Sequence, residues 1–402
     1  MGAQMMGVEA DGVRTAVPGA SQAAWRPHWP TLALLVIALA GLAGPFESGA
    51  GAYLLTDSGG PLISGLALLV LLGAAVLPAA WGGPWTVPIA TPLALLAGFL
   101  AMLGQRSLPG AADWGYWLTL VGSLAAAATA AGRISVIELE SDAPRWQHRL
   151  QGLVPAATVA FLVLLVWEGL VVGSRVPKGI FPRVSDIWAA LLGTWRVLLA
   201  DAYLTFVREV LFGFAVGLTT GFLVGSAIAF SRFLQRGFLP LATAFGAVPI
   251  VGLAPVLGRA LGVDWESKAA VVVIVTFFPV VLNTVQGLTL VDPLKLELLR
   301  SYAAGPLKVF FSLRVPNALP YLFNALKVAV VIGIVSVIVA EFLIPGPPNG
   351  LGQRISLSAH RGAFDVVFAA IFVSSVISMA LYATITLLER VLTAWHPSTR
   401  GS

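Results

Sequence analysis

Ionisable side chains gather in one segment of this chain, between Asp292 and Pro320, where apolar sequence surrounds them. Only 11% of the 402 residues are charged and 58% are hydrophobic. Charged groups are costly in lipid, so this segment is expected to lie in water, where carboxylates, amines and guanidinium groups can bind a partner. The segment is therefore the first candidate for a functional contact. Its charged residues are Asp292, Lys295, Glu297, Arg300, Lys308 and Arg314.

Other kinds of chemistry find no support in the sequence. Cysteine is absent, which excludes disulfides, thiolate metal sites and thiol catalysis. The histidines lie far apart and no His-Glu-x-x-His pattern occurs, so a zinc hydrolase is not indicated. The phosphate-binding pattern G-x-x-x-x-G-K-[ST] is also absent. The sequence offers no pair of nucleophile and base that would indicate an intramembrane enzyme. We therefore expect no catalytic residue, no metal site and no cofactor bound by this chain.

The charged segment has the signals of a helical hairpin. Asp292 followed by Pro293 is a strong helix start, because the carboxylate caps free N–H groups and proline fits the first helical position. Gly305 and Pro306 predict the end of this helix, with glycine in the left-handed cap. A second short helix is predicted to stop at Pro316. Helices this short are marginal alone in water, so they need a surface on which to pack.

The rest of the sequence predicts an all-α polytopic membrane protein. Its mean hydropathy is +0.89, and ten apolar runs approach or exceed the length that crosses roughly 30 Å of hydrocarbon. These runs lie at 31–46, 62–81, 84–104, 114–132, 152–172, 204–230, 238–262, 268–288, 321–344 and 364–388.

The charged stretches between these runs suggest a domain organisation. We predict a cytoplasmic N-terminal tail over 1–30, a four-helix membrane extension over 31–132, a cytoplasmic linker over 133–150 and a second domain over 151–402. An excess of Lys and Arg on one side places the hairpin and both termini in the cytoplasm. The net charge of +5 fits this topology signal better than a nucleic-acid site.

Two further patterns concern packing. From Ser185, polar and apolar residues alternate at helical spacing, which predicts an interfacial helix on the outer face. Glycines then recur every fourth residue and place a small surface on one side of a helix, which predicts close packing against a neighbour. They are Gly213, Gly217, Gly221 and Gly225.

Four residues within apolar runs are candidates for lining a solute path. Pro249 and Pro255 break helical hydrogen bonds, which either borders a cavity or simply kinks a helix. Asn283 carries an amide that seeks a partner and often bridges helices. Glu341 either faces the path or caps the interface of its run.

The hairpin resembles the cytoplasmic coupling loop of ABC importer permeases. The pattern of that loop is Glu-x-Ala, then Gly, then Pro at fixed spacing. Glu297 matches its Glu and Pro316 its Pro, whereas Leu299 stands where Ala is usual and Ala303 where Gly is usual. The two departures favour the hypothesis of a diverged subunit in a heterodimer.

The resemblance extends from about Trp167 to Pro397 and is closest to the nitrate, sulfonate, taurine and pyrimidine-precursor permeases. The first 133 residues lie outside it. The matching motifs are, in chain order, Trp167-Glu168, Ile180-Phe181-Pro182, Val248-Pro249, Leu253-Ala254-Pro255, Asn283-Thr284, Gly287-Leu288, Val291-Asp292-Pro293, Ala340-Glu341, Gly350-Leu351-Gly352, Glu389-Arg390 and Trp395-His396-Pro397.

The resemblance implies a type I importer permease domain over 151–402, with its coupling loop at 289–320, in the cell inner membrane. It implies cytoplasmic ATPase subunits that use ATP and Mg, an extracytoplasmic solute-binding protein, and a second permease copy or a homologous permease. The residues expected to couple to the ATPase are Asp292, Pro293, Glu297, Leu299, Arg300, Ala303, Gly305, Arg314 and Pro316.

The favoured function is therefore ATP-driven import of a small solute by alternating access. A sulfonate, nitrate, a pyrimidine precursor and a riboflavin-like heterocycle all remain open. The main alternative is a proton-coupled secondary transporter that uses a membrane carboxylate such as Glu168 or Glu341. A structural membrane scaffold is the third possibility.

Overall fold

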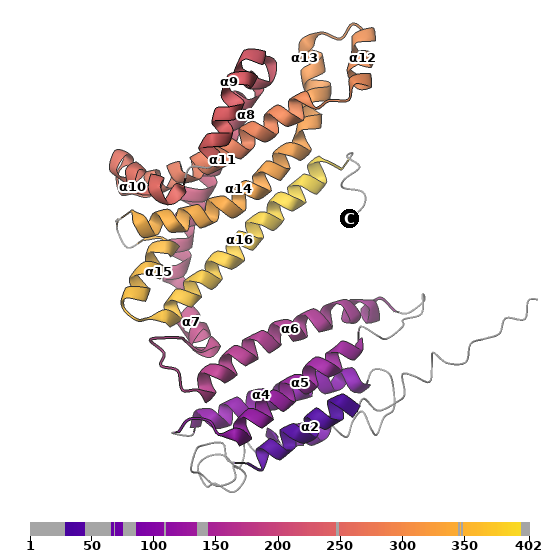
Figure 1. The fold of residues 1–402 in the computed structure, drawn as a ribbon, viewed down its shortest axis with the longest axis vertical. Coiled ribbons are helices and arrows are strands. Elements are labelled where there is room, and N and C mark those ends of the chain that lie inside the picture. The colour runs from indigo at the N-terminus through magenta and orange to yellow at the C-terminus, as the bar shows by residue number, and fades with distance from the viewer. Residues whose placement is uncertain are drawn as a thin grey trace, which may run out of the picture. The chain divides into compact units, whose positions relative to one another are not determined.

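The computed structural model describes residues 29–44, 66–67, 69–74, 86–107, 110–134, 144–246, 249–344, 346 and 349–394. Within these ranges the regular elements are helices, and no strand occurs (Figure 1). The predicted all-α class is therefore confirmed for the part of the chain described. The chain divides into two compact units, Met1–Pro177 and Lys178–Ser402.

Helices rich in alanine and glycine build the first unit. In its centre α5 packs against α2, α4 and α6. The close approach depends on small residues, since a methyl group on Gly122 would lie 2.8 Å from the backbone nitrogen of Ala38. The helices are α2 (Trp29–Leu42), α4 (Thr86–Ser107), α5 (Trp114–Ile134) and α6 (Arg145–Gly173).

Helix α6 was assigned from the sequence to the second domain, yet here it packs on α4 and α5. Its polar contacts also lie in this unit, because Glu168 pairs with Arg106 at 3.7 Å and the Tyr116 hydroxyl donates to the Gly169 carbonyl. The domain limits over 1–30, 31–132, 133–150 and 151–402 stay a prediction.

The second unit is built around α11, which packs along α8 on one side and α14 on another. Helix α16 packs on α14 and α7. The elements are α7 (Val184–Ala202), η2 (Tyr203–Leu211), α8 (Phe212–Phe230), α9 (Arg232–Gly246), α10 (Ile250–Leu261), α11 (Trp265–Thr289), α12 (Pro293–Ser301), α13 (Pro306–Val309), η3 (Phe310–Arg314), α14 (Val315–Leu343), α15 (Leu351–His360) and α16 (Phe364–Leu392); η2 and η3 are π-helical.

The glycine row of α8 is buried against α11, which confirms the predicted close packing. A methyl group on Gly217 would lie 2.8 Å from Cβ of Thr276, and one on Gly225 would lie 2.7 Å from Cβ of Thr284. Both distances are shorter than a carbon–carbon contact, so the helices can touch only because these side chains are absent.

Five helices of the described residues are long and apolar enough to cross a membrane, which makes the chain a multi-pass membrane protein. They are Gln151–Gly173, Val184–Phe230, Trp265–Thr289, Pro306–Leu343 and Phe364–Leu392. The predicted number of ten spans stays a prediction, and much of the run at 62–81 lies outside the described residues.

The single span predicted at 238–262 is wrong, because two helices occupy this run. Helix α9 ends at Gly246 and α10 begins at Ile250, with Pro249 as its N-cap residue at φ −67°. Proline has no N–H to donate and its fixed φ suits the start of a helix. Pro249 therefore begins a helix and does not kink one.

A separate helix from Ser185 was also expected, but α7, η2 and α8 form one continuous helix of 47 residues. At 1.5 Å per residue it is about 70 Å long, more than twice the roughly 30 Å of hydrocarbon. Part of this helix must therefore lie outside the hydrocarbon or along its surface.

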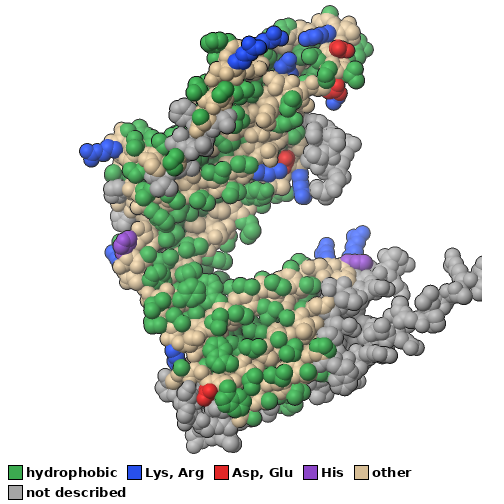
Figure 2. Space-filling view, in the orientation of Figure 1, with side chains coloured by type: hydrophobic (Ala, Val, Ile, Leu, Met, Phe, Trp, Pro, Cys, Tyr) green, Lys and Arg blue, Asp and Glu red, His purple; other side chains and the backbone are tan. Residues whose placement is uncertain are grey.

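The hairpin of α12 and α13 extends beyond the ends of α11 and α14, whereas α10 and α15 lie at the other end of these helices (Figure 1). Charged side chains gather at the end with α9, α12 and α13, and hydrophobic side chains cover much of the helices that lead to it (Figure 2).

Candidate functional site

The hairpin begins as its sequence predicts. The Asp292 carboxylate accepts a hydrogen bond from the backbone N–H of Leu294 at 2.9 Å, and Pro293 occupies the first turn of α12. An N-cap of this kind is worth about 1 kcal/mol. The predicted start of the first helix is therefore confirmed.

The end of α12 differs from the prediction. The left-handed residue is Ala303, at φ 53°, and Gly305 has an ordinary φ of −64°. The Ala303 N–H donates to the Arg300 carbonyl at 2.9 Å, and the Ala304 N–H donates to the Leu299 carbonyl at 3.0 Å. This bond pair is the Schellman cap, which prefers glycine at the left-handed position. The glycine usual at this place in the coupling-loop pattern thus has a conformational reason.

The second helix does not stop at Pro316. Helix α13 continues through η3 into α14, so Pro306–Leu343 is one helix. A proline inside an α-helix removes one hydrogen bond and crowds the carbonyl four residues before it. Here the turn before Pro316 is π-helical, over Phe310–Arg314, and a wider turn can accommodate that crowding.

The first helix of the hairpin carries an apolar row that no other part of the described protein covers. Leu294, Leu298 and Tyr302 follow one another at four-residue spacing and are 74%, 57% and 78% exposed. Such spacing places them on one face of a helix. Leu296 and Leu299, on the same helix, are half-buried and do not belong to this exposed row.

Exposed side chains next to this row complete the surface. Leu307 on α13 is 72% exposed and Phe311 on η3 is 65% exposed. The charged residues Lys295, Glu297 and Arg300 are also exposed. We call this surface, with Leu294, Leu298 and Tyr302, the hairpin face.

Two side chains that do not belong to the hairpin face anchor the hairpin. The Arg314 guanidinium donates to the Leu288 carbonyl at 2.8 Å and lies over the Phe230 ring, 5.6 Å from its centroid. The Asn317 amide donates to the carbonyls of Gly287 and Leu290. Carbonyls at a helix end lack intrahelical partners, so both residues complete the end of α11. The sequence did not single out Asn317.

The path candidates are not brought together. Pro255 lies inside α10, and Pro249 is the N-cap residue of that helix; both residues are exposed. The half-buried Asn283 donates to the Pro279 carbonyl at 2.9 Å, within its own helix and not across to another. Glu341 is 1% exposed. Their role in a path stays a prediction.

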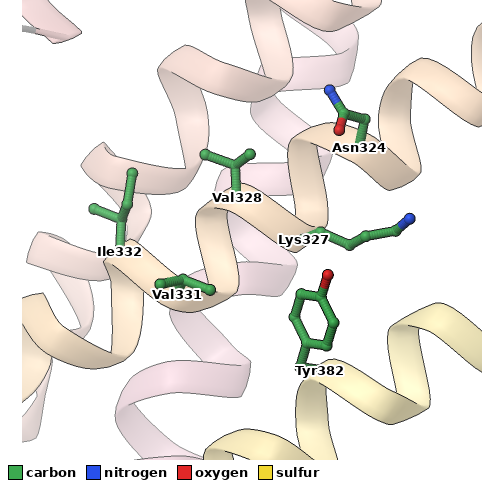
Figure 3. A pocket seen from close by; sticks show the side chains of 6 residues that line it. All are labelled: Asn324, Lys327, Val328, Val331, Ile332 and Tyr382. Atoms are coloured by element: carbon green, nitrogen blue, oxygen red, sulfur yellow. The ribbon is translucent and has the colours of Figure 1, made fainter.

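A hollow of about 470 Å³ lies between α14 and α16, where sequence reasoning predicted no site (Figure 3). The Lys327 side chain reaches from α14 toward α16, and the Tyr382 hydroxyl points toward it. Lys327 pairs with Glu389 at 2.5 Å. The lining is completed by Asn324, Val328, Val331 and Ile332.

Comparison with known proteins identifies the family. The pattern described as "Binding-protein-dependent transport system inner membrane component" matches residues 217–393. The formylaminopyrimidine transport permease protein ThiX of Halalkalibacterium halodurans is 31% identical over 255 residues, which are 61% of this chain and 97% of ThiX. The chain belongs to the ABC importer permease family.

Other relatives of this permease carry different names. The riboflavin transport system permease protein RibX of Chloroflexus aurantiacus is 29% identical over 59% of this chain and 88% of its own length. The taurine transport system permease protein TauC of Escherichia coli is 27% identical over 63% of this chain and 93% of its own length. Members of the family are transport subunits and not enzymes, and the ATPase is a separate subunit.

The left-handed alanine of the permease makes a testable prediction. Ala303→Gly is expected to stabilise the end of α12 by about 1 kcal/mol, because the left-handed conformation costs other residues about 1–2 kcal/mol. The Ala304 amide should then exchange its hydrogen roughly fivefold more slowly. Ala304→Gly is the control and should not slow exchange. Equal exchange in Ala303→Gly and the wild type would contradict this account of the cap.

A second prediction concerns the anchor. Arg314→Met keeps much of the side-chain volume but removes the hydrogen bond to Leu288 and the charge over Phe230. A hydrogen bond from a charged group is worth about 1.5–3 kcal/mol, so proteolysis within 292–312 should become at least about tenfold faster. Lys308→Met, at an exposed position of α13, is the matched control. Equal cleavage of the two variants would show that Arg314 does not hold the hairpin.

Proposed function

We propose that this permease is the transmembrane subunit of an ATP-driven importer and that the hairpin face is the docking site of its ATPase subunits. The observation that carries the proposal is the exposed apolar row Leu294, Leu298 and Tyr302, placed on a charged hairpin at the end of the long apolar helices. Apolar side chains exposed in water together mark an interaction surface. ATP and Mg belong to the partner subunit, and this chain contributes no catalytic residue.

The hairpin can transmit motion because both of its ends are tied to long helices. It follows α11 directly, and α13 continues into α14 as one helix. Arg314 and Asn317 hold the base of the hairpin to the end of α11. A displacement of the docked hairpin would therefore move α11 and α14, and alternating access would follow from such rigid-body motion.

In the proposed topology the permease lies in the cell inner membrane. The hairpin and both chain termini are in the cytoplasm. The end with α10 and α15 would then face the extracytoplasmic solute-binding protein. A second copy of this chain, or a homologous permease, would complete the translocation unit. Family membership supports ATPase and solute-binding partners.

The proposed cargo is a small polar solute. Relatives are named for transport of formylaminopyrimidine, riboflavin and taurine, so a heterocycle and a sulfonate are both candidates. Pro249, Pro255, Asn283 and Glu341 remain the path residues proposed from the sequence. The hollow at Lys327 adds a hydrogen-bonding surface within the membrane part.

The deciding experiment is reconstitution of the permease with an ATPase subunit and a solute-binding protein of the same cell. We expect a stable complex whose ATP hydrolysis rises when the solute-loaded binding protein is added. A permease that binds no ATPase, together with uptake driven by a pH gradient alone, would overturn the proposal in favour of a secondary transporter. Unchanged uptake in Glu297→Lys would favour the alternative of a structural membrane scaffold.

A further inference from the structure

A group of polar side chains, most of them buried, joins five elements at the end of α11 and α14 that lies away from the hairpin. Asp201, Thr205, Glu209, Lys268 and Glu341 are each at most 4% exposed. They come from α7, η2, the first turn of α11 and the last turn of α14, and Arg354 joins them from α15. We call these six residues the polar cluster.

Both carboxylate oxygens of Asp201 have hydrogen-bond donors. Asp201 Oδ2 accepts from Arg354 Nε at 2.7 Å, and Oδ1 accepts from the Gly350 N–H at 3.2 Å. A buried ion pair is tolerated when further hydrogen bonds satisfy its atoms. Asp201 and Arg354 therefore balance each other in charge.

Glu341 is also provided with donors. Its Oε1 accepts from the Thr205 hydroxyl at 2.7 Å, and its Oε2 accepts from the Gly352 N–H. The Leu351 N–H donates in turn to Thr205 Oγ1 at 2.9 Å. A methyl group on Gly352 would lie 2.6 Å from Glu341 Oε2, so the glycine permits the approach. These contacts suit a negatively charged Glu341.

Glu209 differs from Asp201 and Glu341 in its lack of hydrogen-bond donors among the described residues. It is 0% exposed, and neither of its carboxyl oxygens receives an N–H or O–H donor from the described residues. It stands four residues after Thr205 on the π-helical η2, and its carboxyl group lies against that of Glu341. Two carboxylates in contact are two acceptors with no hydrogen between them.

The charges of the polar cluster do not balance if every carboxyl group is ionised. Among the described residues, Lys268 is the cation that lies near both Glu209 and Glu341, and its Nζ donates to the Val263 carbonyl at 3.2 Å. Asp201 is matched by Arg354, so Lys268 faces two glutamates. An unmatched buried carboxylate is so costly that the group becomes neutral instead.

We propose that Glu209 and Glu341 bind one proton between them. This proton stays bound where η2, α11, α14 and α15 pack together. Carboxyl groups in contact cannot both ionise. With the proton on Glu209, its O–H donates to the Glu341 carboxylate, and the contact becomes a hydrogen bond. The polar cluster is then neutral, with Asp201 and Glu341 opposite Lys268 and Arg354.

Infrared spectroscopy of the full-length permease in lipid at neutral pH tests this assignment. The wild type should show the C=O stretch of a protonated carboxylic acid. The band should be lost in Glu209→Gln and in Glu341→Gln, because each variant leaves one glutamate facing Lys268. Glu266→Gln, at an exposed position of the same turn of α11 as Lys268, should retain it. A band that survives in Glu209→Gln would overturn the proposal.

Stability provides the second readout. The amide of Glu209→Gln is neutral and can donate to Glu341, so its thermal midpoint should equal that of the wild type. A large loss of stability in Glu209→Gln would mean that an ionised Glu209 is needed and would also overturn the proposal. If Glu341→Gln fails to fold, the Glu209→Gln band and midpoint still decide. Neither readout needs an ATPase or a solute.

Discussion

Gly221→Leu is expected to unfold the second unit of the permease at temperatures that the wild type tolerates. A methyl group alone on Gly221 would lie 2.9 Å from Cβ of Val280 and 3.0 Å from the Phe277 carbonyl oxygen. Three further carbons have no space, so α8 would have to move off α11. Overpacking of this kind costs at least about 1–3 kcal/mol, and the loss of contact along the helix adds to it.

The measurement is the thermal midpoint of the purified permease in detergent, followed by tryptophan fluorescence and by size exclusion after heating. Gly193→Leu is the matched control, because Gly193 lies on α7 with no atom near the place of a side chain. That variant should keep the wild-type midpoint. Equal midpoints in the two leucine variants would mean that α8 and α11 do not meet through their glycine face.

Leu298→Asp is expected to abolish ATP-driven uptake while leaving the permease folded. Leu298 lies in the middle of the exposed row of the hairpin face and is 57% exposed, so the free protein loses little. In the complex a charge would replace an apolar contact. Central contacts of an interface are often worth about 2 kcal/mol or more, so affinity for the ATPase should fall at least about thirtyfold.

The control for this variant is Val263→Asp, in the short loop before α11 and thus at the end of that helix away from the hairpin. Val263 is also exposed, at 45%. The two variants should have equal thermal midpoints, and only Leu298→Asp should lose the ATPase in co-purification. Full binding by Leu298→Asp would remove the hairpin face from the docking surface.

The sequence was most informative where local chemistry decides the conformation. Asp292 and Pro293 fix the start of α12, because the capping carboxylate and the proline ring act within one turn. The glycine spacing of α8 placed a small face on one side of a helix, and that face packs on α11. Motif order from Trp167 onwards led to the ABC importer permease family, which the comparisons confirmed.

Sequence reasoning failed where a residue could adopt either of two local structures. Gly305 was the obvious left-handed cap, but Ala303 takes that conformation because two hydrogen bonds to the preceding turn form there. Pro316 was taken as a helix stop, although the π-helical turn before it lets the helix continue. Pro249 was assigned to the middle of one span and instead begins α10.

By itself, therefore, the sequence determined that this is a helical, multi-pass membrane protein with a charged hairpin outside its apolar helices. Hydropathy, capping residues and residue spacing are properties of neighbouring positions and can be read along the chain. Only the tertiary structure decided that Arg314 and Asn317 close the end of α11, and that Glu209 and Glu341 meet in the polar cluster. Arg314 and Leu288 are 26 positions apart in the sequence, and Glu209 and Glu341 are 132 positions apart. Local pattern carries no information about partners at such distances.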